Sequence, residues 1–153
     1  MARLEDLTPA MAQRLRELDC PVYPSAPFVA GGKLSSRRVA IVSSAGIHRR
    51  GEPPMMPGAN EFRALPASLP AADIVMTHVS VNYDRTGFQR DINTIYPIDR
   101  LRELAREGVI GSVADTHYSV MGANDPKQWD ALADQLVDRL RQDRVDAVLL
   151  SPV

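Results

Sequence analysis

Four short apolar runs are the feature that most constrains how this chain of 153 residues can fold. Each run is continuous rather than alternating with polar residues, which is typical of strands buried on both faces of a parallel sheet. Segments with a helical pattern separate some of these runs. This order predicts an α/β fold, with a mostly parallel sheet flanked by helices in a single domain. The runs are residues 38–43, 73–79, 109–115 and 146–150, and residues 62–66 are expected to form a short edge strand.

Two helices are predicted within the α/β region. The first spans residues 99–107, and Gly108 is expected to end it, as glycine commonly does. The second follows Asp125, which is a predicted N-cap. Its apolar stripe is expected to face the core, with Trp129 buried there, and consists of Trp129, Leu132, Ala133, Leu136, Val137 and Leu140.

The N-terminal region is expected to differ from the rest of the chain. Thr8 followed by Pro9 is typical of a helix start, and the apolar stripe of this helix is Leu4, Leu7, Met11, Leu15 and Leu18. Closely spaced prolines then predict an extended segment. We therefore expect residues 1–36 to form a helix and a proline-rich extension, and residues 37–153 to form the α/β domain.

Composition excludes several classes of protein. The net charge is -1 and acids and bases are mixed, so the chain shows no basic stripe that would bind nucleic acid and no basic helix for a membrane surface. Its apolar runs are far shorter than the roughly 20 residues of a membrane span. Acidic residues near the N-terminus argue against a secretory signal, so we expect a cytoplasmic protein. Cys20 is the single cysteine, which excludes an internal disulfide.

Polar residues gather where the predicted strands end. His48 follows the first run, and His78 lies near the end of the second, with Asn82, Asp84 and Arg85 beyond it. Asp115, His117 and Tyr118 lie at the end of the third run. Ligands of open α/β sheets bind outside the carboxyl ends of the strands. We therefore expect the three histidines, Asp84, Arg85 and Asp115 to surround one cleft.

Simpler roles remain open for the same residues. Each histidine can hydrogen-bond a loop backbone, and Arg49-Arg50 can be a solvated loop surface rather than an anion site. The histidines offer suitable zinc ligands but no close spacing motif, so we predict no metal site. The chain carries neither a phosphate-binding loop nor a nucleophile elbow. From the residues alone, the prediction is a polar cleft without a reactive centre.

Three stretches resemble the selenoprotein B family, the substrate-handling subunits of glycine, sarcosine, betaine and D-proline reductases. They read RRVAIVSSAGIHRRG, ADIVMTHVSVNYDRTGFQRDINTIYPIDRLRELAREGVIGSVADTHYSVMG and VDAVLLSPV. The resemblance spans roughly residues 37–153. Its most specific part is the spacing of Asp91, Asn93, Tyr96, Pro97, Ile98, Asp99, Leu101, Glu103, Leu104, Glu107, Gly108, Ile110 and Gly111.

This resemblance implies a reductase that cleaves a C–N bond of a small amino acid or amine with electrons from thiols. It implies a selenocysteine immediately after Val153, so we expect that the chain is truncated at a UGA codon and is inactive in this form. A partner subunit carrying a pyruvoyl group is implied as well. Together with their positions, the resemblance assigns catalytic roles to His78, His117 and Asp84, and substrate binding to Arg85, His48, Asn93 and Asp115.

Three alternatives stay open. The chain can be a non-catalytic protein that binds a ligand or docks a partner in the same cleft. It can be a metal-dependent lyase or hydrolase that uses His48, His78 and His117. It can also be a partial domain whose exposed sheet edge is covered by self-association. A homo-oligomer is expected, with no nucleic-acid or membrane partner.

Overall fold

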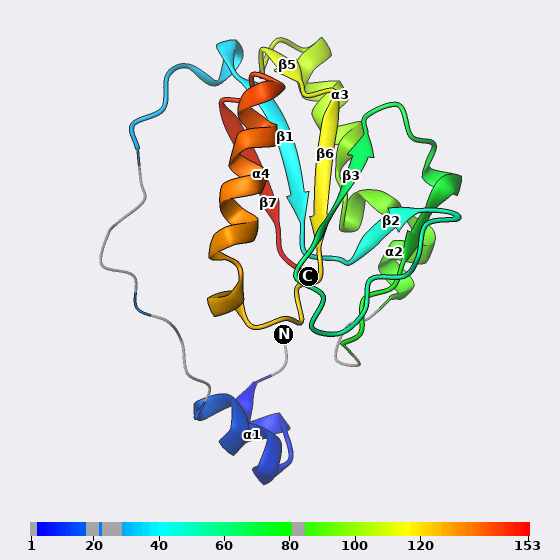
Figure 1. The fold of residues 1–153 in the computed structure, drawn as a ribbon, viewed down its shortest axis with the longest axis vertical. Coiled ribbons are helices and arrows are strands. Elements are labelled where there is room, and N and C mark those ends of the chain that lie inside the picture. Colours follow the sequence, from blue (N-terminus) through cyan, green and yellow to red (C-terminus); the bar gives the residue numbers. More distant parts are fainter. Residues whose placement is uncertain (1–2, 18–21, 23–28, 81–84) are drawn as a thin grey trace.

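A computed structural model describes residues 3–17, 22, 29–80 and 85–153 of the chain. The helices are α1 (Pro9–Arg16), α2 (Thr86–Arg90), α3 (Ile98–Arg106) and α4 (Asp130–Gln142). The strands are β1 (Arg38–Ser43), β2 (Ile47–Arg49), β3 (Phe62–Pro66), β4 (Ile74–Met76), β5 (Ser112–Val113), β6 (Thr116–Val120) and β7 (Ala147–Ser151). The predicted α/β fold is confirmed (Figure 1).

The main sheet is centred on β1 and is mostly parallel. β1 pairs in parallel with β7 on one side and with β5 and then β6 on the other. β3 extends the sheet as an antiparallel edge strand beside β6, in agreement with the prediction for residues 62–66. Since β1, β6 and β7 run in the same direction, their carboxyl ends lie at one edge, which we call the carboxyl edge.

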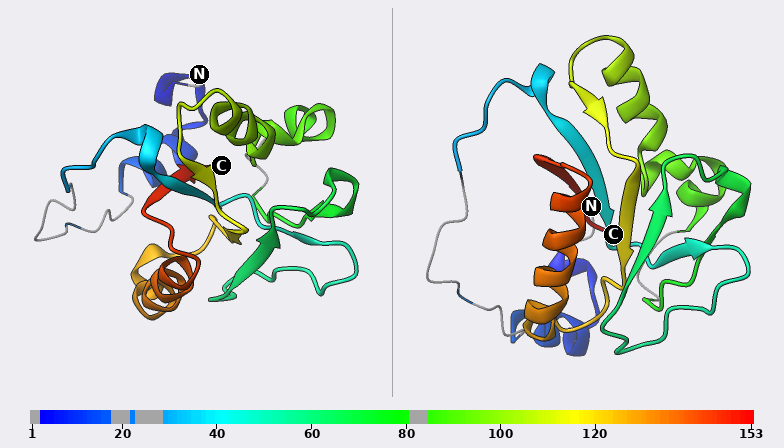
Figure 2. Two further views of the ribbon diagram at one scale, coloured as in Figure 1. Left: turned by 90° about the horizontal axis from the view of Figure 1, so that it is seen from above. Right: turned by 45° about the horizontal axis from the view of Figure 1, so that its top comes forward.

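Helices cover both faces of this sheet, as Figure 2 shows. One core cluster joins Ile41 of β1 to Ile98 and Leu101 of α3. The other joins Ala40 of β1 to Leu140 of α4. Neighbouring residues of β1 thus pack against opposite helices, which explains why this strand is a continuous apolar run.

Two of the predicted strands differ from the structure. Only Ile74–Met76 of the run 73–79 is a strand, and it pairs antiparallel with β2 in a separate two-stranded sheet. Only Ser112–Val113 of the run 109–115 is a strand, and the chain resumes pairing as β6, which the sequence analysis missed. β6 contains the polar residues Thr116, His117 and Ser119, so it does not stand out in the sequence as an apolar run. Its last four residues are nevertheless buried.

The helix predictions are largely confirmed. Thr8 accepts a hydrogen bond from Met11 N at 3.4 Å at the start of α1, and Gly108 follows α3 with a positive φ of 72°. Asp125 does not cap α4: it accepts a bond from Lys127 N, and Trp129 is the residue before the helix. Trp129 is half-buried rather than in the core, and Val137 is 40% exposed.

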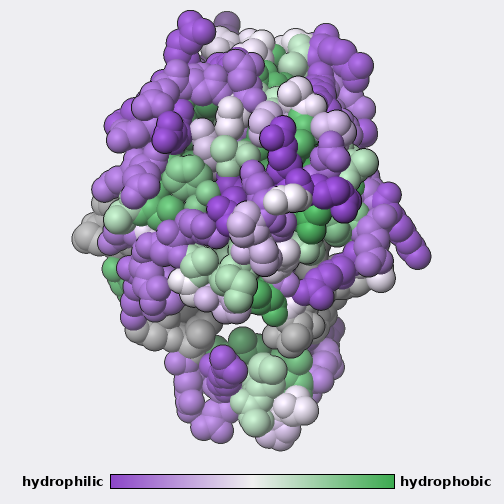
Figure 3. Space-filling view, turned by 45° about the vertical axis from the view of Figure 1, so that its right-hand side comes forward, coloured by the Kyte–Doolittle hydropathy of each residue, from purple (hydrophilic) through white to green (hydrophobic). Residues whose placement is uncertain are grey.

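The N-terminal division stays a prediction, because much of the proline-rich segment, with Cys20, lies outside the described residues. Hydrophilic side chains dominate the surface drawn in Figure 3, and apolar residues show there in separate patches. Within the described part of the chain, none of the helices combines the length and apolar character needed to cross a bilayer.

Candidate functional site

The carboxyl edge of the sheet converges on Ser44, the residue after β1. Ser44 N donates to Ser151 O at 3.0 Å, and Ser44 O accepts from Gly122 N at 2.9 Å. Its hydroxyl oxygen accepts a hydrogen bond from Val153 N at 2.8 Å. The residues that follow β1, β6 and β7 are therefore tied together at one point.

A close backbone approach underlies this convergence. A Cβ atom added to Gly122 would lie 2.8 Å from Ser44 Cβ and from Ser44 O. Those distances are shorter than side chains tolerate, so a residue without a side chain is required at Gly122. Because Gly122 lies shortly after β6, it lets that segment cross directly over the end of β1.

Two further serines hold the segment before α3 against the same edge. Ser43 Oγ and Ser151 Oγ both donate to Ile95 O, at 2.8 and 3.0 Å. Ile95 and Tyr96 are both 1% exposed. The hydroxyls therefore satisfy a buried carbonyl that no regular helix or strand would otherwise pair.

His78 lies at this carboxyl edge, as predicted. Thr77 N donates to Gly46 O at 3.0 Å, two residues after Ser44. Gly46 has a φ of 61°, and an added Cβ would lie 3.3 Å from the backbone N and Cα of His78. Glycine is thus needed both for the backbone conformation and for the close contact. His78 itself is 5% exposed.

Arg85 reaches back to the same loop. Its Nη2 donates to His78 O at 2.5 Å and to Ser80 O at 3.4 Å. Burial, and then the positive charge of Arg85, lower the pKa of His78 below its ordinary value. At neutral pH the imidazole of His78 is therefore uncharged and lies close to a permanent cation.

His117 is not at the carboxyl edge. It lies within β6, is fully buried, and its Nδ1 accepts a hydrogen bond from Ile41 N at 2.9 Å. This bond fills the gap between β5 and β6, where the backbone ladder with β1 is interrupted. The Tyr96 ring packs edge-to-face against it, with centroids 5.6 Å apart. His117 is thus a structural part of the core, and its predicted place in a cleft is wrong.

Asp115 is also misplaced by the sequence prediction. It precedes β6 instead of ending a strand, so it lies at the amino edge of the sheet, opposite the carboxyl edge. There its carboxylate lies 3.0 Å from Arg38 Nη2, and its side chain is 88% exposed. The error follows from the missed strand β6. Because Asp115 comes directly before β6, it lies at the amino edge and not at the carboxyl edge.

The other predicted residues have different surroundings. His48 is 3% exposed in β2, opposite Val75 of β4, and its Nδ1 lies 2.9 Å from Arg49 O. It belongs to the same two-stranded sheet that leads into His78. Asp84 lies outside the described residues.

Asn93 braces the start of α3. Its Oδ1 accepts from Asp99 N at 3.0 Å, and its Nδ2 donates to the carboxylates of Asp91 and Asp99 at 2.8 and 3.1 Å. The backbone N–H of Asn93, and then its side-chain amide, lower the pKa of Asp91, and the side-chain amide lowers the pKa of Asp99. The most specific part of the family-like spacing therefore builds a turn that positions Ile95 and Tyr96.

Replacing Asn93 by alanine is expected to destabilise the protein by about 1–2 kcal/mol, because a helix-capping acceptor and two amide donations are lost together. Chemical denaturation at neutral pH measures this effect. Thr94→Ala is the matched control, since the Thr94 hydroxyl donates to Asp91 O at 2.9 Å in the same turn. An Asn93→Ala protein as stable as the control would contradict the structural role.

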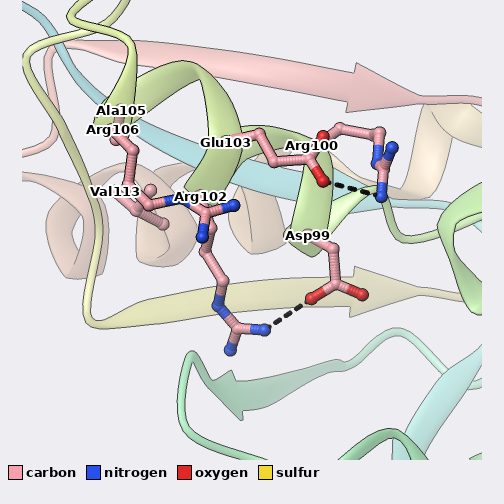
Figure 4. A pocket seen from close by; sticks show the side chains of 7 residues that line it. All are labelled: Asp99, Arg100, Arg102, Glu103, Ala105, Arg106 and Val113. Atoms are coloured by element: carbon pink, nitrogen blue, oxygen red, sulfur yellow. Dashed lines mark hydrogen bonds and ion pairs between the residues drawn. The ribbon is translucent and has the colours of Figure 1, made fainter.

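A separate hollow of about 640 Å³ lies along α3 (Figure 4). Val113 in its lining pairs with Val39 near the start of β1, so the hollow is remote from Ser44. Its lining includes Asp99 and Arg102, which pair at 2.7 Å, and Arg100 and Glu103, which pair at 3.0 Å. These two guanidinium groups already have carboxylate partners within the lining.

Among the described residues, no three or more His, Cys, Asp or Glu side chains come together to hold a metal ion. Among these residues, His48, His78 and His117 are therefore not gathered into one such group. The serines at the carboxyl edge were missed as site residues. The SS dipeptide after the first strand and the serine near the end of the last strand were visible signals for them.

Comparison with known proteins places most of the chain in one family. Residues 17–153 match the family model for glycine/sarcosine/betaine reductase selenoprotein B. The D-proline reductase subunit gamma of Acetoanaerobium sticklandii is 31% identical over 139 residues, which are 88% of this chain and 57% of that protein. No solved structure matches the chain.

Relatives from glycine and sarcosine reductases match as well. The glycine reductase complex component B subunit gamma of Symbiobacterium thermophilum is 32% identical over 77% of this chain and 29% of its own length. The sarcosine reductase complex component B subunit beta of Peptoclostridium acidaminophilum is 29% identical, over 88% of this chain and 32% of its own length. The chain thus spans about a third to just over half of these relatives.

Proposed function

This chain belongs to the glycine/sarcosine/betaine reductase selenoprotein B family. On that premise, we propose that it is a substrate-handling part of a reductase. The reductase would cleave a C–N bond of a small amino acid or amine. Its matched relatives are named as subunits of D-proline, glycine and sarcosine reductases. The reaction class adds two electrons and two protons across the broken bond, and thiols supply the electrons as they are oxidised.

One observation carries the proposal more than any other. Ser44 joins the ends of β1 and β7 through its bonds to Ser151 O and Val153 N, and His78 lies beside Gly46 at the same edge. Ligands of α/β sheets bind at such an edge. A reactive group carried just beyond Val153 would therefore emerge on the side of the sheet where His78 and Arg85 lie.

Two residues have properties that suit this reaction. Because its pKa is lowered, His78 is uncharged at neutral pH, so its imidazole is suited to accepting a proton from the ammonium group of a bound amino acid or amine. Arg85 uses Nη2 for its backbone contacts, and a guanidinium has further N–H donors that can bind the carboxylate of an amino acid. Asp84 stays in the proposal as a neighbour of Arg85, whereas His117 and Asp115 do not.

The proposal includes groups that this chain does not contain. We propose that the reactive selenium belongs to a selenocysteine following Val153 in the longer protein, and that a partner subunit with a pyruvoyl group takes part. The chain's one cysteine cannot form a redox pair within the chain, so residues 1–153 by themselves are expected to be inactive. Assembly with partner subunits is consistent with relatives named as components of reductase complexes.

The test is a longer protein that carries selenocysteine or cysteine after Val153, assayed with its partner subunits and a dithiol. D-proline, glycine, sarcosine and betaine are the substrates to compare, and either the freed amine or the ring-opened product is measured. We expect one of them to be turned over, with no turnover by a matched protein carrying serine at that position. Equal activity of the serine protein, or binding of these compounds without any turnover, would refute the reductase role.

Within that longer protein, Arg85→Lys tests substrate binding. It keeps the charge but loses the planar pair of donors, so we expect a KM about tenfold higher with a smaller change in kcat. Arg90→Lys is the matched control, because Arg90 is an exposed arginine at the end of the same short helix. An unchanged KM for Arg85→Lys would remove this residue from the proposed site.

A further inference from the structure

We propose that Thr77 is a positioning residue for His78. Its hydroxyl joins the segment after β1 to the segment before β3, and so holds His78 in place at the carboxyl edge. This role rests on the proposed function, in which His78 accepts a proton from the substrate. The contacts that support it all lie within the part of the chain that the structure describes.

Thr77 is the residue between β4 and His78, and its side chain connects two other segments. Its backbone N donates to Gly46 O at 3.0 Å, and its hydroxyl donates to the same oxygen at 3.3 Å. The hydroxyl oxygen also accepts a hydrogen bond from Met55 N at 3.1 Å. A threonine hydroxyl offers one donor and can also accept, and both capacities are used here. The segments that contain Gly46, Met55 and His78 therefore meet at this one side chain.

The N–H of Met55 depends on the Thr77 hydroxyl. Met55 is 1% exposed, and a buried N–H without an acceptor is costly. A valine at position 77 has the shape of threonine but offers no acceptor. Met55 N–H then has to turn towards water, and this movement takes its segment away from residue 77.

The segment between β2 and β3, drawn in teal in Figure 1, is also held to the residues after β6. Asn124 Oδ1 accepts from Gly58 N at 2.9 Å, and Asn124 Nδ2 donates to Ala59 O at 2.6 Å. The segment thus links residues that follow β6 to residues that follow β4. Thr77 is its contact beside His78.

His78 fits closely against Gly46, so its position is sensitive to this junction. A Cβ added to Gly46 would lie 3.3 Å from the backbone N and Cα of His78. Arg85 holds the carbonyl of His78 through Nη2 at 2.5 Å. His78 is therefore held through Thr77 before it and through Arg85 after it, and loss of the Thr77 hydroxyl is expected to loosen the packing around its ring.

The first test is an NMR titration of the His78 ring in the 153-residue chain. Burial is the largest cause of the lowered pKa of His78, so looser packing should raise that pKa, by about half a pH unit in Thr77→Val. Thr77→Ser keeps the hydroxyl and should leave the pKa near its native value. Thr116→Val is the matched control, because Thr116 is also half-buried but begins β6 at the amino edge. An unchanged pKa in Thr77→Val, or an equal rise in Thr77→Ser, would overturn the positioning role.

Hydrogen exchange of the native chain tests the same junction without any substitution. The amide of Met55 is expected to exchange about a hundredfold more slowly than that of Met56, whose side chain is 59% exposed. Equal exchange rates for the two amides would show that the bond to Thr77 does not hold the segment, and would overturn the inference even if Thr77→Val fails to fold.

The last test uses the longer protein with its partner subunits. Thr77→Val is expected to lower kcat about tenfold because the proton acceptor is displaced, with a smaller change in KM, and Thr77→Ser should restore kcat. A normal kcat for Thr77→Val would overturn the positioning role and leave the reductase proposal standing. The titration and the exchange measurement require no turnover, so failure of the reductase proposal is distinguishable from failure of this one.

Discussion

Lowering the pH from 6.5 to 4 is expected to remove about 3 kcal/mol from the free energy of unfolding through one residue, His117. Burial, the largest cause, lowers the pKa of His117 to about 4, and the positive charge of Arg102 acts in the same direction. Each pH unit between the two pKa values is worth about 1.4 kcal/mol, which gives this total. A domain of this size has a total stability on the order of 5–15 kcal/mol, so the loss is large.

The sign follows from which state binds the proton. An unfolded chain binds a proton at the ordinary pKa of 6.5, whereas folded His117 resists it until about pH 4. The stability is therefore complete above pH 6.5, falls as the pH drops towards 4, and falls no further from this source below that value. The structural reason is that Nδ1 must stay unprotonated to accept the Ile41 N–H, and the ring is 0% exposed.

The measurement is urea denaturation of the native protein and His117→Gln at intervals from pH 7 to pH 4. Glutamine can offer an acceptor to Ile41 N but does not titrate in this range, so the variant should be less stable at pH 7 and should lose less stability on acidification. The difference between the two curves removes the contribution of the carboxyl groups. Parallel curves would show that His117 is not the group responsible.

The elements that sequence alone predicted well are those whose burial is visible in their composition. Residues 38–43 have apolar side chains for both faces of the sheet, and α3 has a single apolar stripe ended by Gly108. β6 escaped prediction because His117 and Ser119 are polar residues inside the core, where each accepts a hydrogen bond from the backbone of a distant segment. One of these is the bond that Ser119 Oγ accepts from Ile47 N at 2.9 Å. Such pairings depend on distant segments that composition does not reveal.

The same limit explains the outcome for the candidate site. His78 and Arg85 were predicted at the carboxyl edge because they follow a run that does lead there, although that run joins a separate two-stranded sheet. His117 and Asp115 were misplaced together, since both predictions assumed that the third strand ends at about residue 115. The convergence on Ser44 depends on Gly122 and Val153, which are far from it in the sequence and meet only in the folded chain.

Asp143→Ala is expected to cost about 3 kcal/mol, because it breaks the cluster that closes the amino edge of the sheet. Asp143 Oδ1 accepts from Arg38 Nη2 at 2.5 Å, and Oδ2 accepts from the backbone N of Asp115 and Thr116 at 2.9 and 3.2 Å. The side chains of Arg38 and Asp143 are 21% and 18% exposed. Removing one member of a largely buried ion pair leaves the other charge without compensation, which typically costs 3–5 kcal/mol, and partial exposure places this pair at the lower end of that range.

Asp138→Ala is the control for this prediction, since Asp138 lies in α4 five residues before Asp143 and pairs with Arg141 at 3.7 Å, with both side chains more than 70% exposed. A surface pair of that kind contributes about 0–0.5 kcal/mol.

Burial raises the pKa of Asp143, but the hydrogen bonds from Arg38 and Thr116 outweigh it and leave the pKa lowered. The contribution of Asp143 is therefore present above its ordinary pKa of 3.8 and is lost only as the pH falls below that value. Stability measured against pH should therefore fall in two ranges, one above pH 4 to which His117 contributes and one below pH 3.8 to which Asp143 contributes. An Asp143 variant that alters only the upper range would contradict the assignment.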